Sequence, residues 1–322
     1  MGYWLQRVAM AALLLLAVSM LTFGAMNVLG DPLFNILGPL AGDTENAESL
    51  AKIEAAEAQY YLDKPLPERY LRWLGDFVTG DMGVQFSTDG QPPVSDLVKE
   101  RLPRSLTLMV MAQTIALVIA IPWGLFAASR ANSVTDRAST VVSFGLVSLP
   151  NFALAVILLY VFGIKLDWLP DTYNAADPFL ARLHQLVLPA LTLALPAAAV
   201  YQRLLRTDLI TTLQEDFILM ARSKGVPRRR VLFRHALRPS MFSVITVFGI
   251  NAGALIGGAL VVESYFRIPG VGLSIVEAIL REDFPVVLAL VMVIAFGFVV
   301  LNLLVDVLYH WIDPRIRAGG AR

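Results

Sequence analysis

The sequence predicts an all-α integral membrane protein with six transmembrane helices. Of its 322 residues 57% are apolar and only 16% are charged, with a mean hydropathy of +0.64, whereas soluble domains carry about a quarter charged residues. Six stretches without Asp, Glu, Lys or Arg approach the roughly 20 residues that a bilayer core requires. They are continuously apolar, which favours helices over a barrel, and run approximately over Val8–Leu29, Ser105–Ser129, Ala138–Ile164, Leu183–Gln202, Pro239–Val262 and Phe284–Val305.

The distribution of charge predicts the orientation of these helices. The net charge is zero, with 26 basic and 26 acidic residues. With both termini in the cytoplasm, the inside segments hold 15 Lys and Arg residues against six acids, and the outside segments hold 11 bases and 20 acids. Because Lys and Arg favour the cytoplasmic side, we expect both termini to be cytoplasmic.

This topology predicts four regions along the chain. They are a first transmembrane helix over 1–30, an extracytoplasmic segment over 31–104, a five-helix core over 105–308 and a cytoplasmic tail over 309–322. A cleaved signal peptide is the alternative for the first region. Its apolar run is longer than the usual 7–15-residue signal core and its flank carries only Arg7, so a permanent helix is favoured.

The extracytoplasmic segment contains two predicted helices. A polar helix is expected over Thr44–Tyr61, followed by Leu62–Pro67, which cannot be helical throughout because of its prolines. Apolar residues then fall on one face at helical spacing, namely Tyr70, Trp73, Leu74, Phe77 and Val78. Two interpretations remain open for this second helix: it lies in the membrane interface, or it packs on the outer rim of the protein itself.

The third inside loop contains a short basic insert, residues 215–239. Acidic Glu215–Asp216 suits a helix start, and Gly225 suits a helix end. Pro227 suits the first turn of a second helix, which Pro239 is expected to end at the membrane. From these residues alone two roles remain open: a docking element for a cytoplasmic protein, or a loop resting on anionic headgroups.

The insert resembles the cytoplasmic coupling motif of ABC-importer permeases, especially those of the peptide and nickel family. That motif has Glu-Ala-Ala, three residues, Gly, nine residues, then a position commonly His, followed by any residue and Leu-Pro. The positions that match are Ala221, Gly225, His235 and Leu237. The positions that depart from it are Leu219, Met220 and Arg238, which stand where Glu, the first Ala and Pro are expected.

The resemblance covers nearly the whole chain. Residues 62–65, 70–74, 80–83, 100–103 and 313–317 resemble the B-type permease of oligopeptide and dipeptide importers. The resemblance implies the type I ABC-importer permease fold in a bacterial inner membrane, and alternating access for peptides. Nickel chelates or glutathione-like compounds are the alternative cargo in the same family.

The resemblance also implies the partners. They are a second, C-type permease, two ATPase subunits or one fused ATPase, an extracytoplasmic peptide-binding protein and the lipid bilayer, but no nucleic acid. Contact with the ATPases is expected at Phe217, Met220, Ala221, Gly225, His235 and Leu237. The sequence has no Gly-Lys pair and therefore no phosphate-binding loop. ATP and Mg²⁺ are accordingly expected on the partner subunits, with no cofactor on this chain.

Two sets of residues within the spans are candidates for helix packing and for the transport pathway. Small residues recur every fourth position in the fifth span, at Gly249, Gly253 and Gly257, which lets another helix approach closely. Neutral polar residues that could line a pathway are Gln113, Asn151, Asn251 and Asn302. Hydrogen bonding between helices is the alternative role for each of the four.

Two other classes of protein fit the sequence less well. A self-sufficient secondary transporter usually carries an ionisable residue within the membrane, and the six spans have no Asp, Glu, Lys or Arg. An intramembrane enzyme needs a nucleophile with its base or a metal cluster, but Cys is absent and the three His residues are scattered. We therefore expect a transport subunit with no catalytic residues and no metal site.

Overall fold

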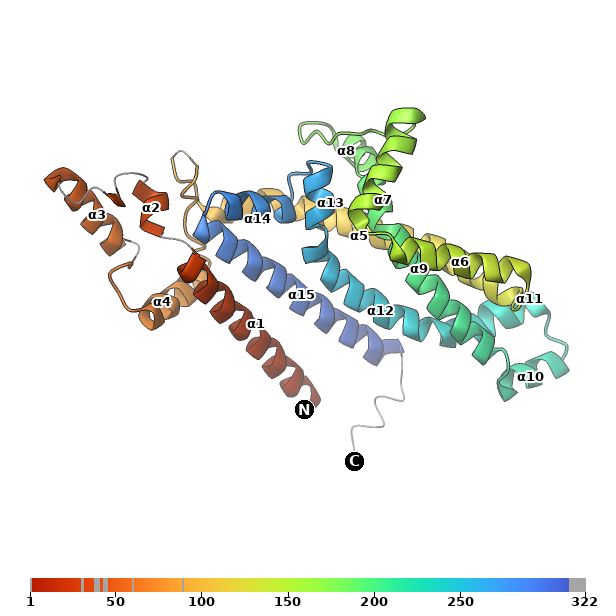
Figure 1. Ribbon diagram of the computed structural model, residues 1–322. Coiled ribbons are helices and arrows are strands. Elements are labelled where there is room, and N and C mark those ends of the chain that lie inside the picture. The colour runs from red at the N-terminus through yellow and green to blue at the C-terminus, as the bar shows by residue number, and fades with distance from the viewer. Residues whose placement is uncertain are drawn as a thin grey trace. The chain divides into compact units, whose positions relative to one another are not determined.

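The computed structural model describes residues 2–29, 32–37, 41–42, 46–59, 61–88 and 90–312. Regular structure in these residues is helical, apart from one isolated β-bridge between Val84 and Pro93 (Figure 1). The elements are α1 (Gly2–Leu29), α2 (Pro32–Leu37), α3 (Ala47–Gln59), α4 (Leu66–Thr79), α5 (Val94–Ser129), α6 (Val134–Ser148), α7 (Asn151–Leu158), the π-helical η2 (Leu159–Lys165), α8 (Phe179–Gln185), α9 (Val187–Thr212), α10 (Asp216–Ser223), α11 (Arg228–Arg230), the π-helical η3 (Val231–Ala236), α12 (Leu237–Gly258), α13 (Leu260–Tyr265), α14 (Val271–Leu280) and α15 (Phe284–Ile312).

Four of the described helices are long and apolar enough to cross a membrane. They are α1 over Leu5–Asn27, α5, α9, and α15 over Phe284–Val305, and they coincide with the first, second, fourth and sixth predicted spans. The number rises to five when the bent pair formed by α6 and α7–η2 is taken as one span. The all-helical membrane architecture is confirmed, whereas six spans and cytoplasmic termini stay predictions.

The third predicted span is broken in the middle. Helix α6 ends at Ser148, Leu149 is extended, and α7 begins directly after Pro150. A residue that precedes proline is driven out of the helical region, and proline itself is well suited to a helix start. Pro150 therefore both ends α6 and begins α7, and the two parts meet at an angle of 107°.

The fifth predicted span corresponds to two helices in sequence. Helix α12 ends at Gly258, and α13 follows after Ala259. Two other helices are longer than the apolar runs that predicted them, because α5 begins at Val94 and α9 continues to Thr212. Charged residues outside a bilayer core can extend a helix without cost, since water solvates their side chains while the backbone bonds continue.

The chain divides into two compact units. The first comprises residues 1–104 and 269–300, and the second comprises residues 105–268 and 301–319. In the first unit, the loop after α4 is tied to the residue before α15: Asp283 accepts hydrogen bonds from the backbone N–H and the hydroxyl of Ser87, at 2.9 and 2.8 Å.

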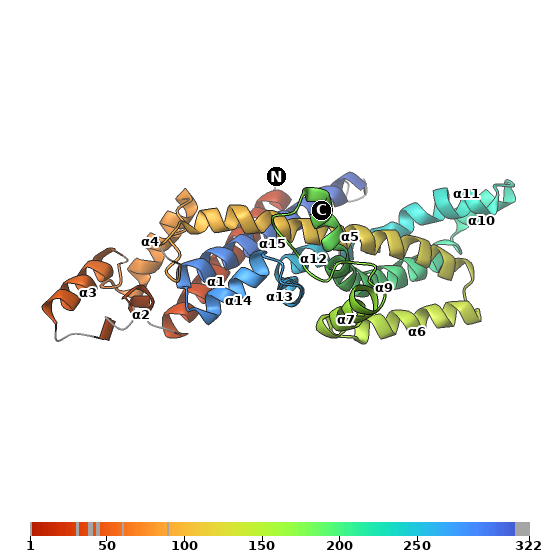
Figure 2. The same cartoon turned by 90° about the horizontal axis from the view of Figure 1, so that it is seen from above.

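Helix α9 is the centre of the second unit. It packs against α6, α7, α8, α12 and α13, which surround it in the two views of Figures 1 and 2. Two buried apolar clusters lie along it, one including Leu188 and Leu193 and the other including Leu205 and Leu209. Each of these four side chains is at most 3% exposed. Apolar contact with α9 is therefore the main cohesion of this unit.

Gly249 lies where α12 approaches α15 within the second unit. A Cβ atom added at Gly249 would be 2.9 Å from the Cβ of Val305 and closer still to both of its γ-methyl groups. Gly253 is buried on the same helix, and the surroundings of Gly257 lie outside the described residues. The geometry at Gly249 is what a helix-packing residue requires.

We expect Gly249→Ala to lower the free energy of unfolding by about 1–3 kcal/mol, because the added methyl group overpacks the contact with Val305. The melting temperature of the purified chain in detergent measures the effect. Combining it with Val305→Ala should recover part of the loss, since both γ-methyl groups are removed while the Cβ of residue 305 stays close to the added methyl group. Gly145→Ala is the matched control, because a Cβ there meets nothing within 4 Å. Equal melting temperatures for Gly249→Ala and Gly145→Ala would contradict the close approach.

Candidate functional site

The inside insert folds as a helix, a left-handed turn and a second helical stretch. Helix α10 ends at Ser223, and Gly225 follows with φ +74°. Glycine adopts this conformation without steric cost and commonly ends helices in this way. Pro227, in extended conformation, then precedes α11. The predicted helix, bend and second helix are thus all present, and they lie beyond the ends of α9 and α12 (Figure 1).

The predicted end of the second helix at Pro239 is wrong. Helices α11, η3 and α12 follow one another without a gap, and Pro239 is the third residue of α12. Proline cannot donate a hydrogen bond to the carbonyl four residues earlier, and its ring crowds that carbonyl. The wider π-helical turn directly before it relieves the conflict, as the bond from the N–H of Leu237 to the carbonyl of Leu232 illustrates.

Ile218 attaches α10 to the body of the second unit. Its side chain is fully buried and belongs to the same apolar cluster as Leu205 and Leu209 of α9. Ala221 and Val226 are partly buried and pack against that cluster. Helix α10 packs on η3, and one apolar cluster joins both to α9, so a force applied to α10 is transmitted to α9 through packed side chains.

The opposite face of α10 is apolar and exposed. Phe217, Leu219 and Met220 are 46%, 50% and 59% exposed. Phe233, on the following helical stretch, is 54% exposed. A group of large apolar side chains on an otherwise basic, polar loop is typical of a surface that another protein covers.

Three of the six predicted coupling residues are exposed and three are partly buried. Phe217 and Met220 are exposed, as is Gly225 in the turn. Ala221, His235 and Leu237 are partly buried, and Leu237 packs against the same cluster as Ile218. Sequence analysis missed Leu219 and Phe233 as exposed residues and Ile218 as the anchor. The three-residue spacing of Ile218 and Ala221 on α10 was the available signal for the buried face.

Two polar contacts lie near the insert: one joins the insert to the end of α5, and the other joins α6 to α9. The guanidinium of Arg228 donates to the carbonyl oxygen of Ser129, at 3.2 Å, where α5 ends. In the next helix, Asp136 is 3% exposed and accepts a hydrogen bond from Arg206 of α9, with 2.6 Å between Nη2 and Oδ2. Asp136 also accepts from the backbone N–H of Asn132 at 2.9 Å. A planar guanidinium and a carboxylate held by two bonds form a geometrically specific link.

The predicted pathway residues Gln113 and Asn251 meet at a third residue, Tyr201 of α9. The Tyr201 hydroxyl donates to the side-chain oxygen of Gln113 at 2.8 Å, and the Asn251 amide donates to that hydroxyl at 3.3 Å. Gln113 and Tyr201 are buried, at 4% and 0% exposed. This chain of bonds joins α5, α9 and α12, the arrangement expected of polar residues that hold helices together.

Asn151 and Asn302 lie apart from this chain of bonds. Asn151 is exposed and is the first residue of α7, at the bend of the third span. Asn302 is half-buried on α15. Of the four polar residues, Asn151 is thus the one whose side chain is open to its surroundings.

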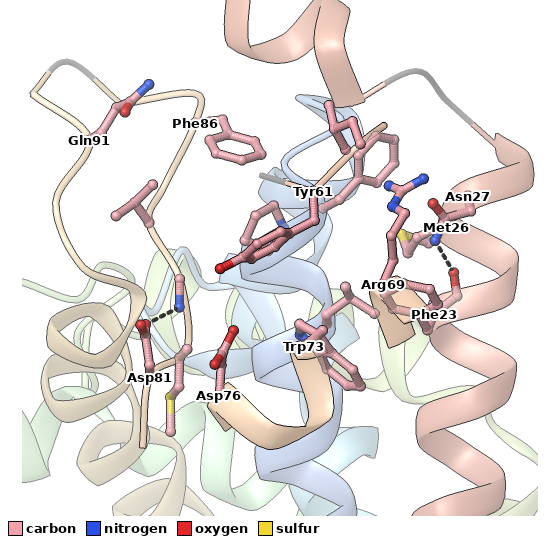
Figure 3. Close-up of a pocket in the computed structure, with 17 residues that line it drawn as sticks. Phe23, Met26, Asn27, Tyr61, Arg69, Trp73, Asp76, Asp81, Phe86 and Gln91 are labelled. Carbon is pink, nitrogen blue, oxygen red and sulfur yellow. Dashed lines mark hydrogen bonds between the residues drawn. The ribbon is translucent and has the colours of Figure 1, made fainter. Parts of the chain in front are cut away.

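A cavity of about 470 Å³ lies in the first unit, remote in sequence from the inside insert (Figure 3). Its walls come from α1, the residues directly before α4, α4 itself, the loop after α4 and the start of α15. The aromatic side chains in it are Phe23, Tyr61, Trp73, Phe86 and Phe284, and its charged side chains are Arg69, Asp76 and Asp81. Among the residues that the structure describes, no group of three or more His, Asp or Glu side chains could hold a metal ion.

Comparison with known proteins adds two findings. The sequence model of the family described as "Binding-protein-dependent transport system inner membrane component" matches residues 120–318, a range that includes the inside insert. The chain is 37% identical to the oligopeptide transport system permease protein AppB of Bacillus subtilis, over 98% of this chain and 99% of the relative. It is 36% identical to a putative peptide permease protein of Brucella ovis, over 98% of both chains. It is 35% identical to the glutathione transport system permease protein GsiC of Escherichia coli, over 94% of both chains.

We expect Ile218→Ala to release α10 from the second unit. Truncation of a buried Ile costs roughly 2–5 kcal/mol, so the amide hydrogens of α10 should exchange with solvent at least about tenfold faster. Hydrogen exchange of the purified chain, followed by mass spectrometry, measures this. Leu219→Ala is the control, because that side chain is half exposed and its removal leaves no cavity. The anchoring role of Ile218 is refuted if both variants exchange alike.

Proposed function

This chain belongs to the family of binding-protein-dependent transport system inner membrane components, and from that membership we propose that it is the permease subunit of an ATP-driven peptide importer. It forms half of the translocation pathway and couples the motion of partner ATPases to alternating access. Three features support the proposal: the helical membrane architecture, the absence of a phosphate-binding loop on this chain, and the exposed apolar face of α10.

The proposed topology has six spans and both termini in the cytoplasm of a bacterial cell. The excess of Lys and Arg on the inside segments supports it. In this arrangement the bent α6–α7 pair is the third span, and α12 with α13 is the fifth. The segment over 31–104 then lies outside the membrane, where a peptide-binding protein would deliver its cargo.

In the proposed mechanism the ATPases grip the exposed face of α10 through Phe217 and Met220. Gly225 sets the turn that presents this face, while Ala221, His235 and Leu237 hold the insert on the body of the permease. When ATP binding draws the ATPases together, α10 moves α9 with it, because Ile218 belongs to the apolar cluster that joins the two helices. The chain of bonds from Gln113 through Tyr201 to Asn251 passes that movement to α5 and α12.

Peptides are the proposed cargo because the named relatives from Bacillus and Brucella are peptide permeases. The glutathione permease relative supports the second candidate, a glutathione-like compound. The pathway itself would be uncharged, since the predicted spans carry no Asp, Glu, Lys or Arg. Neutral amides such as Asn151 can accept and donate hydrogen bonds to varied peptide backbones without fixing one side chain.

The proposed function is tested by purification and uptake. A tagged chain should co-purify with a second permease and with ATPase chains, and vesicles holding this complex should take up peptide only with ATP and the binding protein. A secondary transporter, by contrast, would work alone under an ion gradient. Gradient-driven uptake by this chain alone in liposomes would overturn the proposal.

The coupling surface is tested by Phe217→Asp and Met220→Asp. Both side chains are half exposed, so the chain should fold, whereas a charge within the interface should weaken ATPase association at least about tenfold. Ala221 is unsuitable for this test because a larger side chain there would disturb the apolar cluster first. Val134→Asp, at a residue 81% exposed on the same predicted side of the membrane, is the control. ATPase retention equal to the control would remove α10 from the interface.

A further inference from the structure

Helix α4 presents its side chains to three different surroundings within the first unit. Tyr70 and Trp73 pack against α1 through Phe23, with ring centroids 5.5 and 5.6 Å away. Arg69 and Asp76 face the cavity of about 470 Å³ described above. A third side of the helix carries Leu71, Leu74 and Val78, which recur at helical spacing. We call these three residues the bare stripe.

The contact with α1 includes a specific pair of hydroxyl groups. The hydroxyl oxygens of Ser19 and Tyr70 are 2.8 Å apart. Ser19 donates its only hydroxyl hydrogen to the carbonyl oxygen of Leu16, at 2.8 Å. Tyr70 is therefore the donor in the pair with Ser19. Ser19 is fully buried. An aromatic contact and a directed hydrogen bond together fix the place of α4 along α1.

That place lies at membrane depth. The apolar span of α1 runs over Leu5–Asn27, and Ser19 is eight residues before its end at Asn27. With a rise of about 1.5 Å per residue, Ser19 lies roughly 12 Å inside that end, within a hydrocarbon core about 30 Å thick. Phe23, four residues from Asn27, lies roughly 6 Å inside. Because Tyr70 touches Ser19, α4 reaches below the headgroup level of this leaflet.

The cavity determines which side of α4 stays polar. Figure 3 shows Arg69, Trp73 and Asp76 of α4 around the cavity, with Asn27 at the end of α1 beside Arg69. Further round the helix, Arg72 donates to Glu68 at 2.8 Å. The charged residues of α4 therefore lie on the cavity side and its neighbouring face, and the bare stripe lies on a different side of the helix.

Two of the three side chains of the bare stripe are largely uncovered within the part of the chain that the structure describes. Leu71 is 66% exposed and Val78 is 77% exposed, while Leu74 between them is half-buried. Moving such side chains from water into an apolar environment is favourable by about 25 cal/mol per Å² of apolar surface. Helices with one charged face and one apolar face commonly bury the apolar face about 5–10 Å into the headgroup and acyl boundary.

We propose that α4 is a membrane anchor whose bare stripe lies in the acyl chains of the leaflet at the Asn27 end of α1. One side of the helix packs on α1, and another side is buried in lipid. We assign lipid and not a second protein as the occupant of the stripe, because the same stretch of the apolar span α1 is itself uncovered: Leu21 and Met20 are 74% and 56% exposed. The anchor holds the residues that follow α4 at a fixed height above the bilayer.

The absence of cysteine from the chain allows a direct test with single cysteine variants. Leu71→Cys and Val78→Cys report on the stripe. Their sequence neighbours Arg72→Cys and Thr79→Cys are matched controls, since each is rotated by about 100° around the helix at nearly the same height. Each variant carries a nitroxide spin label and is reconstituted in phosphatidylcholine vesicles with the subunits that co-purify with it. Collision rates with oxygen, which concentrates in lipid, and with a water-soluble nickel chelate are then measured.

The oxygen-to-nickel collision ratio should be at least about threefold higher at the two stripe positions than at their neighbours. A second measurement uses the unlabelled cysteines: a charged methanethiosulfonate reagent should modify the control positions and spare the stripe. High nickel accessibility at Leu71→Cys and Val78→Cys would place the stripe in water and overturn the proposal. Low accessibility to both probes would mean that protein covers the stripe, which overturns it equally.

Discussion

The interior of a lipid bilayer offers no hydrogen bonds to the backbone, and the rest of this structure follows from that constraint. Every peptide group at membrane depth must find its partner within the protein, so the spans are helices. Charged side chains are moved to the ends of the spans, where Asp136 and Arg206 bind one another. The polar residues considered within the spans are neutral, and Gln113 and Asn251 both form hydrogen bonds with the hydroxyl of Tyr201.

Helix α9 connects the other helices of the second unit with the inside insert. Its middle carries Tyr201, to which two other helices are hydrogen-bonded. Nearer its C-terminal end it carries Leu205 and Leu209, which share an apolar cluster with Ile218 of the insert. Because close-packed interiors transmit displacement, α10 and α9 can move together through apolar packing, without a specific hydrogen bond between them. The proposed coupling therefore needs no specialised residue beyond an anchor, a turn and an exposed apolar face.

The two units use exposed apolar surface in different ways. On α10 the exposed side chains stand on a basic loop predicted to face the cytoplasm, where another protein is the natural cover. On α4 the exposed side chains stand at the depth of a transmembrane helix, where lipid is the natural cover. Exposure alone does not distinguish these cases; the depth of the attachment point does, and Ser19 supplies that depth for α4.

By itself the sequence determined the class of fold, the position of four membrane helices, the helix–bend–helix form of the insert, and the family, which full-length similarity confirmed. These properties follow from local composition and periodicity, which a chain carries before it folds. Only the tertiary structure decided that Pro150 bends the third span by 107°, that a π-helical turn lets α12 continue through Pro239, and that Ala221 turns inward while Leu219 turns outward. Only the tertiary structure showed that Gln113 and Asn251 share the hydroxyl of Tyr201 and that Asp136 binds Arg206. Such contacts form between helices far apart in sequence, and the spacing of residues along one helix does not reveal which helix lies beside it.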